Sequence, residues 1–452
     1  MERRCIVQGL VLLLIWFNNG AMLVKTEEGA PMENKEKEAL YSVIQNFVGG
    51  SWNGSGLYPD PCGWSPIQGV SCDLFKGLWY ITSLSIGPVL DNSLQCAPGA
   101  NFTPMLFELT HLKSLSFFDC FSLNQQLAIT IPSTGWDKFA TTLETLEFRS
   151  NPGLTGPIPT SLGMVKSLKS LVIVGNGLTG EVPFEIGHLV NLRRLVISGN
   201  RLTGSIPTSI GGLTSLLKLD LSHNLLQGNL PTEIGNLKDL NLMDLRNNTF
   251  TGGLVPSLQN MVSLQDLLMS NNLLLGGTLM SIGWSNMVNL TTLDLSNTGI
   301  TGSIPNSLLG LKSMRCLALD NNHLSGNVPQ NLANMPNLSA LYINGNNFTG
   351  ELGFSHDFYE RLGRRFASWN NPSLCYNARE IREGHKGPFG VQKCTGDKGA
   401  SFGQGDKVDR PGPDVNSSLL VSFGLPGYRV SGFWWLVLVR ELVATFFLVM
   451  VL

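Results

Sequence analysis

Charged side chains are scarce in this 452-residue chain, where Asp, Glu, Lys and Arg make up only 14% of the residues and the formal net charge is −2. No stretch is strongly basic, which argues against a nucleic-acid partner because phosphate binding needs clustered Lys and Arg. The six histidines are scattered, and none has a second histidine or a cysteine at metal-ligand spacing. We therefore expect neither a nucleic-acid partner nor a bound metal.

Catalytic motifs are missing as well. The sequence contains no Gly-x-Ser-x-Gly elbow, no phosphate-binding loop and no protein-kinase signature. Gly175-x-Gly177-x-x-Gly180 matches a dinucleotide-binding fingerprint, but no strand–helix–strand unit surrounds it, so no cofactor is expected. The sequence predicts a protein that is not an enzyme.

A repeat of about 24 residues dominates the middle of the chain. Each copy reads Leu-x-x-Leu-x-Leu/Ile-x-x-Asn, as in Leu192 to Asn200, and the alternation within it is typical of a strand with one face in a core. Because an asparagine amide has two donors and an acceptor, stacked asparagines should satisfy the backbone where the chain leaves each strand. The asparagines are Asn151, Asn176, Asn200, Asn224, Asn248, Asn272, Asn322 and Asn346, and Thr298 stands where another is due.

A second motif, Gly-x-Ile-Pro or a close variant, follows most of these asparagines, as in Gly204 to Pro207. Glycine permits a turn there, and proline fixes φ where a backbone donor would lack a partner. Residues 252–256 are one residue too long for the motif, and residues 276–279 lack its proline. Because one repeat cannot bury its leucines alone, the sequence predicts an α/β solenoid, a right-handed superhelix of about eleven repeats.

The two ends carry compartment signals. Arg3 and Arg4 precede an apolar run from Ile6 to Trp16, which is typical of a signal peptide over residues 1–24, with a short membrane anchor as the alternative. Asn-x-Ser/Thr sequons then indicate a glycosylated, extracytoplasmic chain. The sequons are Asn53, Asn101, Asn247, Asn289, Asn337, Asn347 and Asn416.

The C-terminal part changes character. Residues 395–431 are rich in Gly, Asp, Ser and Pro and predict a flexible stalk, whereas residues 432–452 are strongly apolar. With no basic flank after it, this tail is typical of a glycosylphosphatidylinositol (GPI) attachment signal. A transmembrane helix and soluble secretion are the alternatives, and Arg440 and Glu441 within the tail weaken both the GPI and the transmembrane interpretation, because charges are costly at the centre of a helix in a membrane. We expect the outer face of the plasma membrane or the cell wall. Candidate attachment sites are Ser417, Ser418, Ser422 and Gly424.

The remaining boundaries follow from the repeats. We expect an N-terminal cap over residues 34–80, leucine-rich repeats over 81–352 and a C-terminal cap over 353–394. Asn34 should N-cap a first helix over residues 34–47. The apolar face of that helix comprises Leu40, Val43, Ile44 and Phe47. Residues 125–142 are too many for one repeat and should bulge from the rim with Trp136.

Residues between the paired leucines should face outward and stack into columns across the strands. Such mixed charges with scattered aromatic anchors suit a peptide or protein ligand. The alternative is an ordinary solvated sheet, since Leu-Asp-Leu-Ser is a common form of the repeat. The candidate ligand-binding residues are Phe118, Arg149, Arg194, Lys218, Asp220, Asp244, Arg246, Asp266, Asp294, Asp320 and Tyr342.

The Leu-x-Gly-x-Ile-Pro motif resembles the plant-specific class of leucine-rich repeats, and Lys37 to Cys394 resembles a plant receptor-like protein without a kinase domain. Four segments are similar to the Piriformospora indica-insensitive protein 2 group: Glu38 to Tyr41, Asp60 to Trp64, Leu84 to Pro88 and Ser368 to Cys375. The resemblance implies a cell-surface protein in plant–microbe communication, with no catalytic residues and no cofactor.

The resemblance also implies caps held by disulfides. It implies a Cys62–Cys72 bond in the N-terminal cap, while Cys375 and Cys394 flank the C-terminal cap. Cys96 and Cys120 remain as a third pair. Cys316 is left over, either as an intermolecular or redox thiol or as a thiol without a role.

Two functions remain in competition. In the first, a membrane-tethered protein binds an extracellular peptide or protein ligand and signals through a membrane-spanning co-receptor kinase. In the second, a secreted, wall-associated protein inhibits a microbial hydrolase, as polygalacturonase-inhibiting leucine-rich-repeat proteins do. The apolar tail favours the first function, because inhibitors of that kind need no membrane attachment.

Overall fold

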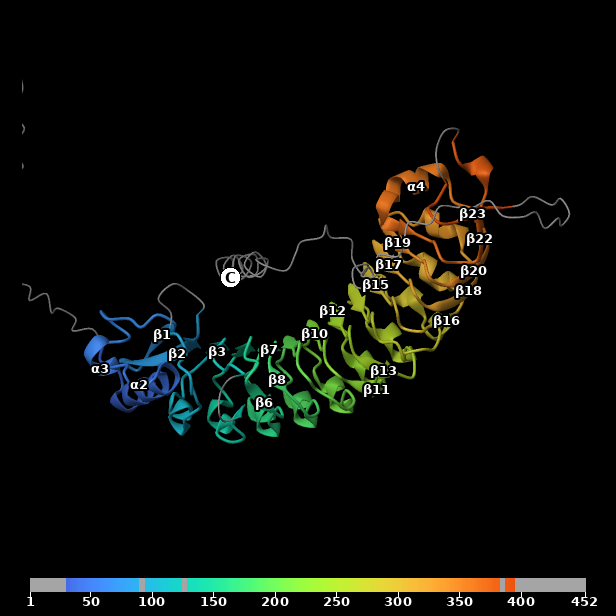
Figure 1. The fold of residues 1–452 in the computed structure, drawn as a ribbon. Helices are drawn as coiled ribbons and strands as arrows, with labels where there is room; N and C mark the ends of the chain where they lie inside the picture. Colours follow the sequence, from blue (N-terminus) through green and yellow to red (C-terminus); the bar gives the residue numbers. More distant parts are fainter. Residues whose placement is uncertain (1–29, 89–93, 124–127, 383–386, 395–452) are drawn as a thin grey trace, which may run out of the picture. The chain divides into compact units, whose positions relative to one another are not determined.

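The computed structural model describes residues 30–88, 94–123, 128–382 and 387–394, which belong to one compact unit ending at Cys394. The expected signal peptide, the stalk, the apolar tail and the Asn416 sequon lie outside the described residues. Figure 1 shows the strands of one long sheet along the inner side of the described unit and short helices along its outer side.

The long sheet has thirteen strands in the described residues. Strands β1 (Val70–Phe75) and β2 pair antiparallel, and every later pair is parallel and joins consecutive repeats. Eleven of the strands belong to repeats, so the predicted solenoid of about eleven leucine-rich repeats is confirmed. After β1 come β2 (Leu78–Ile86), β3 (Ser114–Phe118), β5 (Thr145–Arg149), β7 (Ser170–Val174), β9 (Arg194–Val196), β10 (Lys218–Asp220), β12 (Leu242–Asp244), β14 (Asp266–Leu268), β15 (Thr292–Asp294), β17 (Cys316–Ala318), β19 (Ala340–Tyr342) and β21 (Phe366–Ala367).

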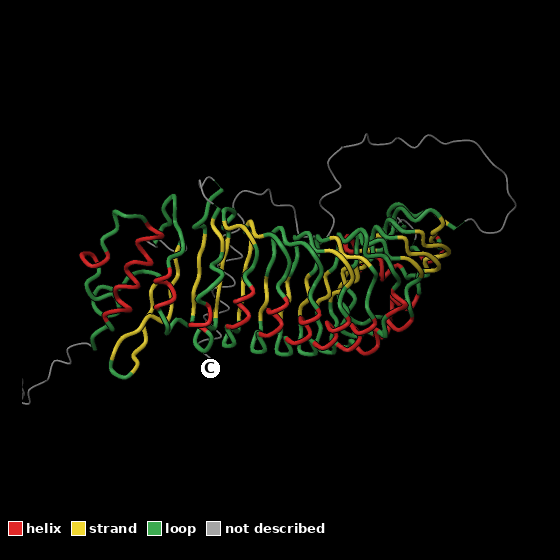
Figure 2. Tube along the Cα trace, turned by 90° about the horizontal axis from the view of Figure 1, so that it is seen from below, coloured by secondary structure: helices red, strands yellow, loops and turns green. Residues whose placement is uncertain are grey.

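The outer side consists of single-turn 3₁₀ helices rather than longer α-helices, and Figure 2 shows them stacked along one edge. Six of them follow directly on the proline of the Gly-x-Ile-Pro motif or of its variants, because proline holds an extended backbone at the helix start. The helices are η1 (Pro104–Glu108), η2 (Trp136–Phe139), η3 (Thr160–Met164), η4 (Phe184–His188), η5 (Thr208–Gly212), η6 (Thr232–Asn236), η7 (Pro256–Asn260), η8 (Leu279–Ser281), η9 (Trp284–Asn286), η10 (Asn306–Gly310) and η11 (Gln330–Asn334).

Three short sheets line the rim between the strands and the helices in the described residues, and one of the two breaks between them falls at the irregular repeats around residues 252–279. Gly252 (φ 78°) and Gly253 (φ 77°) both take the left-handed conformation and accommodate the extra residue there. The rim strands are β4 (Ile129–Thr130), β6 (Leu154–Gly156) and β8 (Gly177–Leu178), then β11 (Gln227–Asn229) and β13 (Thr249–Thr251), then β16 (Thr301–Gly302), β18 (His323–Asn327), β20 (Asn347–Leu352), β22 (Ser373–Tyr376) and β23 (Gln392–Lys393).

The N-terminal cap is built on helix α2 (Asn34–Val48), followed by the single-turn helix α3 (Gly54–Leu57). Glu33, and not Asn34 as predicted, is the N-cap, and its carboxylate accepts a hydrogen bond from the Glu36 N–H at 2.7 Å. The predicted apolar face of the helix is fully buried, and Phe47 packs against Phe117 with ring centroids 5.0 Å apart. The cap therefore covers the apolar end of the first repeats.

The C-terminal cap adds helix α4 (His356–Leu362) and the 3₁₀ turns η12 (Gly363–Arg365) and η13 (Ala378–Glu380) around the last strands. Phe354 and Phe358 are buried there, with ring centroids 4.5 Å apart. This aromatic layer covers the opposite end of the leucine core, as a terminal cap of a solenoid must.

Trp136 does not lie on the rim as predicted. Trp136 begins η2 and is fully buried against Phe107 and Phe139. Its indole N–H donates to the Pro132 carbonyl at 2.7 Å. Burial of the indole is favourable because it removes a large apolar surface from water while the indole N–H keeps a hydrogen-bond partner.

The asparagine ladder is present. The Asn224 amide donates to the Ile197 carbonyl of the preceding repeat at 2.7 Å and to the Leu221 carbonyl of its own repeat at 3.1 Å. Its oxygen accepts the Leu202 N–H at 3.2 Å. At the exceptional position, Thr298 donates its hydroxyl to the Leu295 carbonyl at 2.7 Å. These side chains supply the partners that the backbone lacks where it leaves the sheet.

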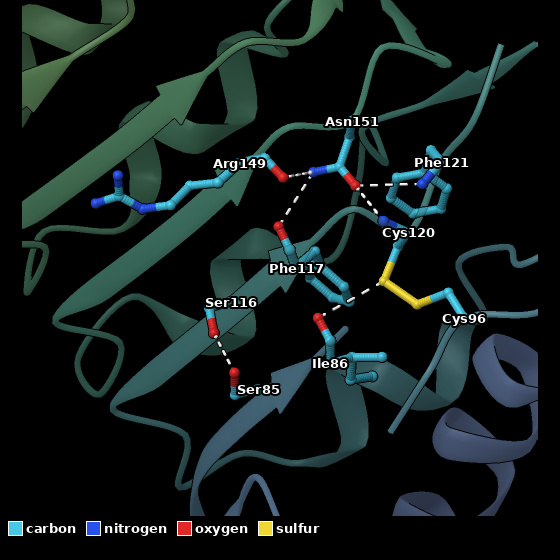
Figure 3. The surroundings of a disulfide bond; sticks show 9 residues. All are labelled: Ser85, Ile86, Cys96, Ser116, Phe117, Cys120, Phe121, Arg149 and Asn151. Carbon is cyan, nitrogen blue, oxygen red and sulfur yellow. Dashed lines mark hydrogen bonds between the residues drawn. A yellow bond between two sulfur atoms is a disulfide. The ribbon is translucent and has the colours of Figure 1, made fainter. Parts of the chain in front are cut away.

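Three disulfides join Cys62–Cys72, Cys96–Cys120 and Cys375–Cys394, which are the pairings expected from the sequence. Figure 3 shows that Cys96–Cys120 lies at the first rung of the ladder. The Cys120 N–H donates to the Asn151 side-chain oxygen at 2.7 Å, and the Asn151 amide donates to the Phe117 carbonyl at 3.1 Å. Cys120 occupies an asparagine position, and its N–H is satisfied by the next rung.

We predict that Asn200→Ala and Asn224→Ala each destabilise the solenoid by about 1–3 kcal/mol, because each leaves buried carbonyls without a donor. Urea unfolding of the purified protein measures the effect. Asn191→Ala is the control, since the exposed Asn191 amide also donates to a carbonyl, that of Lys166 at 2.8 Å. Equal midpoints for all three variants and the wild type refute a structural role for the ladder.

We predict a second, pH-dependent effect at Glu36. Its carboxyl is buried, accepts the Ile81 N–H at 3.0 Å and lies 3.8 Å from His111. Burial raises the pKa of Glu36 to about 7, while the Ile81 hydrogen bond opposes the rise and Glu33 adds to it. The folded state therefore favours the protonated carboxyl, and the stability this contributes is lost as the pH rises towards 7.

Glu36→Gln keeps a hydrogen-bond acceptor but cannot ionise. The variant should melt at a higher temperature than the wild type near pH 8 and at a similar temperature near pH 4, where both forms are neutral. Thermal melts at the two pH values decide the matter, and a pH-independent difference would contradict the burial argument.

Candidate functional site

The inner face of the long sheet is the candidate site, and strand register places its side chains in columns. One column runs through consecutive strands from Val172 to Tyr342, and a second contains Arg194 and Lys218 side by side. Phe118 and Arg149 are register partners in a third. The predicted neighbours on adjacent strands are therefore brought together.

The N-terminal part of this face is rich in cations. Arg149 is half-buried, and its Nε lies 2.8 Å from a carboxylate oxygen of Glu147, a residue the sequence did not single out. Arg194 on β9 and Lys218 on β10 are half-buried register partners. Two adjacent cations attract a carboxylate of a ligand more strongly than either alone.

An ion pair occupies the centre of the face. The Arg246 guanidinium donates to both carboxylate oxygens of Asp244, with Nε–Oδ1 2.9 Å and Nη2–Oδ2 2.6 Å. The hydrogen bond to Asp244 raises the pKa of Arg246, burial opposes the rise, and the charges of Asp244, Asp294 and Asp220 add to it. Arg246 thus neutralises part of an otherwise acidic region.

Three of the predicted ligand carboxylates turn out to be buried rather than solvent-facing: Asp244, Asp294 and Asp320. Asp294 accepts the Ser296 hydroxyl at 2.6 Å, and Asp320 accepts the Asn321 amide at 2.8 Å. These hydrogen bonds hold the carboxylates close to their own strands. Because neighbouring strands lie only about 4.8 Å away, their side chains cover the carboxylates. Burial, with a contribution from Asp294, raises the pKa of Asp320 to about 7.

Asp220 and Asp266 remain half-exposed, as Glu147 does, so these are acidic residues of the face that a ligand reaches directly. Asp220 accepts the Ser222 hydroxyl at 2.7 Å, and Asp266 accepts the Thr291 hydroxyl at 3.2 Å. Tyr342 is half-buried at the C-terminal end of its column. The accessible face therefore runs from cationic through acidic to aromatic side chains.

Sequence reasoning missed the last strand of this face, β21. Asn371 lies one repeat length after Asn346, and its amide donates to the Ile343 carbonyl at 3.1 Å, as a ladder asparagine does. That spacing was a signal for one more strand. Register then adds Arg365 and Trp369 to the columns.

A second row of amides borders the face at the ends of the strands. The Asn271 amide donates to Asn247 at 3.1 Å, and the Asn297 amide donates to Asn271 at 2.9 Å. Asn247 itself is within 3.2 Å of the His223 ring. Asn247 is one of the predicted glycosylation sites and is half-buried, whereas Asn53, Asn101, Asn289, Asn337 and Asn347 are exposed.

Cys316 is a free, half-buried thiol on β17 in the column of Lys218. Burial raises the pKa of Cys316 to about 12, and the charges of Asp294, Asp320 and Asp266 contribute to the rise. The thiol therefore stays protonated at physiological pH, which favours the interpretation that it has no redox role.

Across the described ranges, no group of three or more His, Cys, Asp or Glu side chains is placed to hold a metal ion. Within the same ranges, no helix is both long enough and apolar enough to span a bilayer.

We predict that Cys316 in the native protein reacts with iodoacetamide near pH 8 on the order of 100-fold more slowly than after unfolding in urea, because the thiolate is the reactive form. Mass spectrometry of Cys316 peptides after timed labelling measures both rates. Native labelling as fast as labelling of the unfolded chain would show that the thiol is neither buried nor surrounded by carboxylates.

Known proteins with related sequences share the repeat. A leucine rich repeat family model matches residues 166–226, and a second one matches residues 289–311. The chain is 54% identical over 169 residues to Piriformospora indica-insensitive protein 2 of Arabidopsis thaliana, which covers 37% of this chain and 39% of that protein. It is 32% identical over 154 residues to Receptor like protein 29 of the same plant, covering 32% and 31%. The matches thus span less than half the length of each relative.

Solved structures show the same architecture. A TDR receptor has a TM-score of 0.52 at 28% identity, covering 61% of this chain and 45% of that one. A plant ice-binding protein has a TM-score of 0.55 at 23% identity, covering 80% and 98%, which is a likeness of fold alone. The repeats, the parallel sheet and these matches identify the chain as a leucine-rich-repeat protein that resembles the plant receptor-like proteins.

Proposed function

We propose that this protein is a cell-surface receptor-like protein that binds an extracellular peptide or protein ligand on the inner face of its long sheet and signals through a partner receptor kinase. The observation that carries the proposal is the set of polar columns, which register aligns over consecutive strands. Similarity to Receptor like protein 29 supports the same class.

The size of the face fits an extended peptide. Eight strands, β7 to β19, carry the column from Val172 to Tyr342, and at a strand spacing of about 4.8 Å they span about 34 Å. An extended chain of about ten residues covers that distance. A ligand lying across the strands meets one new repeat with about every one and a half of its residues, so each repeat can contribute to specificity.

The accessible charges define the ligand further. Arg194 and Lys218 favour a carboxylate towards the N-terminal repeats, while Asp220 and Asp266 favour a cation towards the middle. Asp294 and Asp320 are buried, so they contribute to the electrostatic potential of this face without touching the ligand. We infer a ligand of mixed charge, because a uniformly charged ligand would meet repulsion along part of the face.

Signalling then requires a second protein. The sequence holds no kinase signature, and its apolar segment 432–452 is the expected means of attachment to the outer face of the plasma membrane. A ligand transmits a signal only if it favours one state of a protein that crosses the membrane. A co-receptor kinase that joins at the C-terminal repeats, near Tyr342, fulfils this requirement.

The biological setting is inferred from a relative. Piriformospora indica-insensitive protein 2 is named for insensitivity to that organism, and the chain is 54% identical to it over 169 residues. We therefore place the response in plant–microbe communication and choose exudate of that organism as the probe.

We predict that Lys218→Glu reduces the calcium response of root cells to this exudate about tenfold, because it replaces an attraction for a ligand carboxylate by repulsion. Recovery of a receptor kinase by co-immunoprecipitation after treatment should fall in parallel. Lys238→Glu is the matched control, since it makes the same charge change at an exposed position outside the columns.

An equal loss of response in both variants would show an effect of the overall charge and contradict a ligand site on the inner face.

Phospholipase cleavage of intact cells should release the protein and abolish the response. A full response from secreted, unattached protein would favour the hydrolase-inhibitor alternative.

A further inference from the structure

A row of planar polar side chains borders the inner face where the four consecutive strands β10, β12, β14 and β15 end. The Asn297 amide donates to Asn271 at 2.9 Å, and the Asn271 amide donates to Asn247 at 3.1 Å. The Asn247 amide nitrogen in turn lies 3.2 Å from the Nε2 of His223. All four residues have φ between 54° and 59°, so their side chains leave the backbone in the same direction. We call these four residues the amide row.

The amide row keeps part of its hydrogen-bonding capacity. Within the described part of the chain, each of its three amides donates only one of its two N–H groups. Because an amide nitrogen cannot accept, the His223 Nε2 is the acceptor, and the neutral ring carries its hydrogen on Nδ1. His223 is exposed, and the three amides are half-buried. The row therefore presents donors and acceptors, without charge, to a ligand.

Exposed leucines lie beside the amide row. Leu225 follows His223 by two residues and is 53% exposed, while Leu273 follows Asn271 by two residues and is 66% exposed, as is Leu274. The residue between the members of each pair is a buried ladder asparagine, so the side chains on both sides of it face solvent. Grouped exposed leucines mark a contact surface. We call Leu225, Leu273 and Leu274 the leucine strip.

We propose that the amide row and the leucine strip bind a neutral, linear oligosaccharide of β-1,4-linked pyranose sugars. The site lies beside the ligand columns, and the proposal does not depend on the receptor function. Sugar hydroxyls both donate and accept hydrogen bonds, as the remaining positions of the amides do. The C–H faces of the rings are apolar and can cover the leucines.

Spacing favours a sugar chain over a peptide. Successive members of the row lie one strand apart, which is about 4.8 Å. A pyranose ring linked through two equatorial oxygens advances its chain by nearly that length, so each sugar meets one repeat. An extended peptide advances only about 3.4 Å per residue, and its backbone groups fall out of step within two strands. Because the row contains no Lys or Arg, an acidic sugar or a phosphate gains no counter-charge there.

The site requires that Asn247 carry no glycan. Asn247 begins one of the predicted sequons, and a glycan on its Nδ2 would cover the row. The other sequons within the described ranges are exposed and lie outside the row. Mass spectrometry of peptides that contain Asn247 is therefore the first measurement, and full glycan occupancy there overturns the proposal.

The binding test uses the purified full chain in detergent and two sugar hexamers. Cellohexaose has the extended β-1,4 linkage, and maltohexaose joins the same sugars by an α-1,4 linkage that coils the chain. Isothermal titration calorimetry should show that cellohexaose binds at least about tenfold more tightly, since only the extended chain matches the row.

Glycine substitutions remove the amides without straining the backbone, because glycine tolerates positive φ. Glycine already occupies the equivalent position in other repeats, as Gly175 (φ 68°), Gly199 (φ 64°) and Gly345 (φ 66°). Asn247→Gly with Asn271→Gly should lower the affinity for cellohexaose about tenfold. If this double variant has a lower urea midpoint than the wild type, Asn271→Gly alone replaces it, and the same direction of change is expected.

The leucine strip has its own variant, and each part of the site has a matched control. Leu273→Ser with Leu274→Ser should lower the affinity about fivefold. Asn321→Gly is the control for the row, because Asn321 has the same backbone conformation (φ 53°) but donates to Asp320 at 2.8 Å instead of joining the row. Val262→Ser, at a side chain that is 46% exposed outside the strip, is the control for the leucines. Both controls should bind like the wild type.

Equal affinity for the two hexamers, equal loss in the Asn321→Gly control, or no binding of cellohexaose overturns the sugar site. If the row variants lose the exudate response and the wild type binds neither hexamer, this edge contacts a protein instead. Calorimetry on the purified protein needs no signalling partner. Cellohexaose binding by a protein that gives no response to exudate would therefore leave the sugar site standing while the receptor function fails.

Discussion

The buried asparagine ladder is the interaction on which the rest of this structure depends. A chain that leaves a strand every repeat exposes backbone groups that no neighbouring strand can satisfy, and leaving such groups unpaired in the interior is costly. One amide solves this for two repeats at once: Asn322 donates to the Leu295 carbonyl of the preceding repeat at 2.8 Å and to the Leu319 carbonyl of its own repeat at 2.9 Å. Each rung therefore joins neighbouring repeats as well as closing its own. The even stacking of the strands, and with it the columns on the inner face, follows from this shared bonding.

Periodicity made the repeats predictable, and its absence explains the errors. Strands, turns and rungs recur at a fixed interval, so register could be assigned residue by residue without coordinates. Strand β1 carries no repeat motif and was missed, since only its pairing with β2 defines it. Trp136 was placed on the rim because sequence length alone does not say whether extra residues go outward or into the core. Packing against Phe107 and Phe139 decided that question.

The candidate site was predictable in position but not in accessibility. Register followed from the repeat, so Arg194 and Lys218 were correctly placed side by side. The burial of Asp294 depended on a hydrogen bond to Ser296 and on crowding from adjacent strands, which no single repeat encodes. Arg365 and Trp369 were missed for another reason. The cap strand lacks the leucine spacing, and Asn371 alone marks it as a member of the series.

In a solenoid built this way, the residues that hold the fold together differ from the residues that are available to bind a partner. The apolar core positions and the ladder positions recur in every repeat and are buried, so they do not distinguish one ligand from another. Specificity must come from the column positions that the ladder leaves unconstrained, and from the ends, where the repetition stops. At the C-terminal end, β21 keeps the backbone pairing of a repeat while the cap supplies side chains that no repeat carries, Phe389 among them. That combination gives the end of the sheet side chains that differ from those of the columns on the inner face.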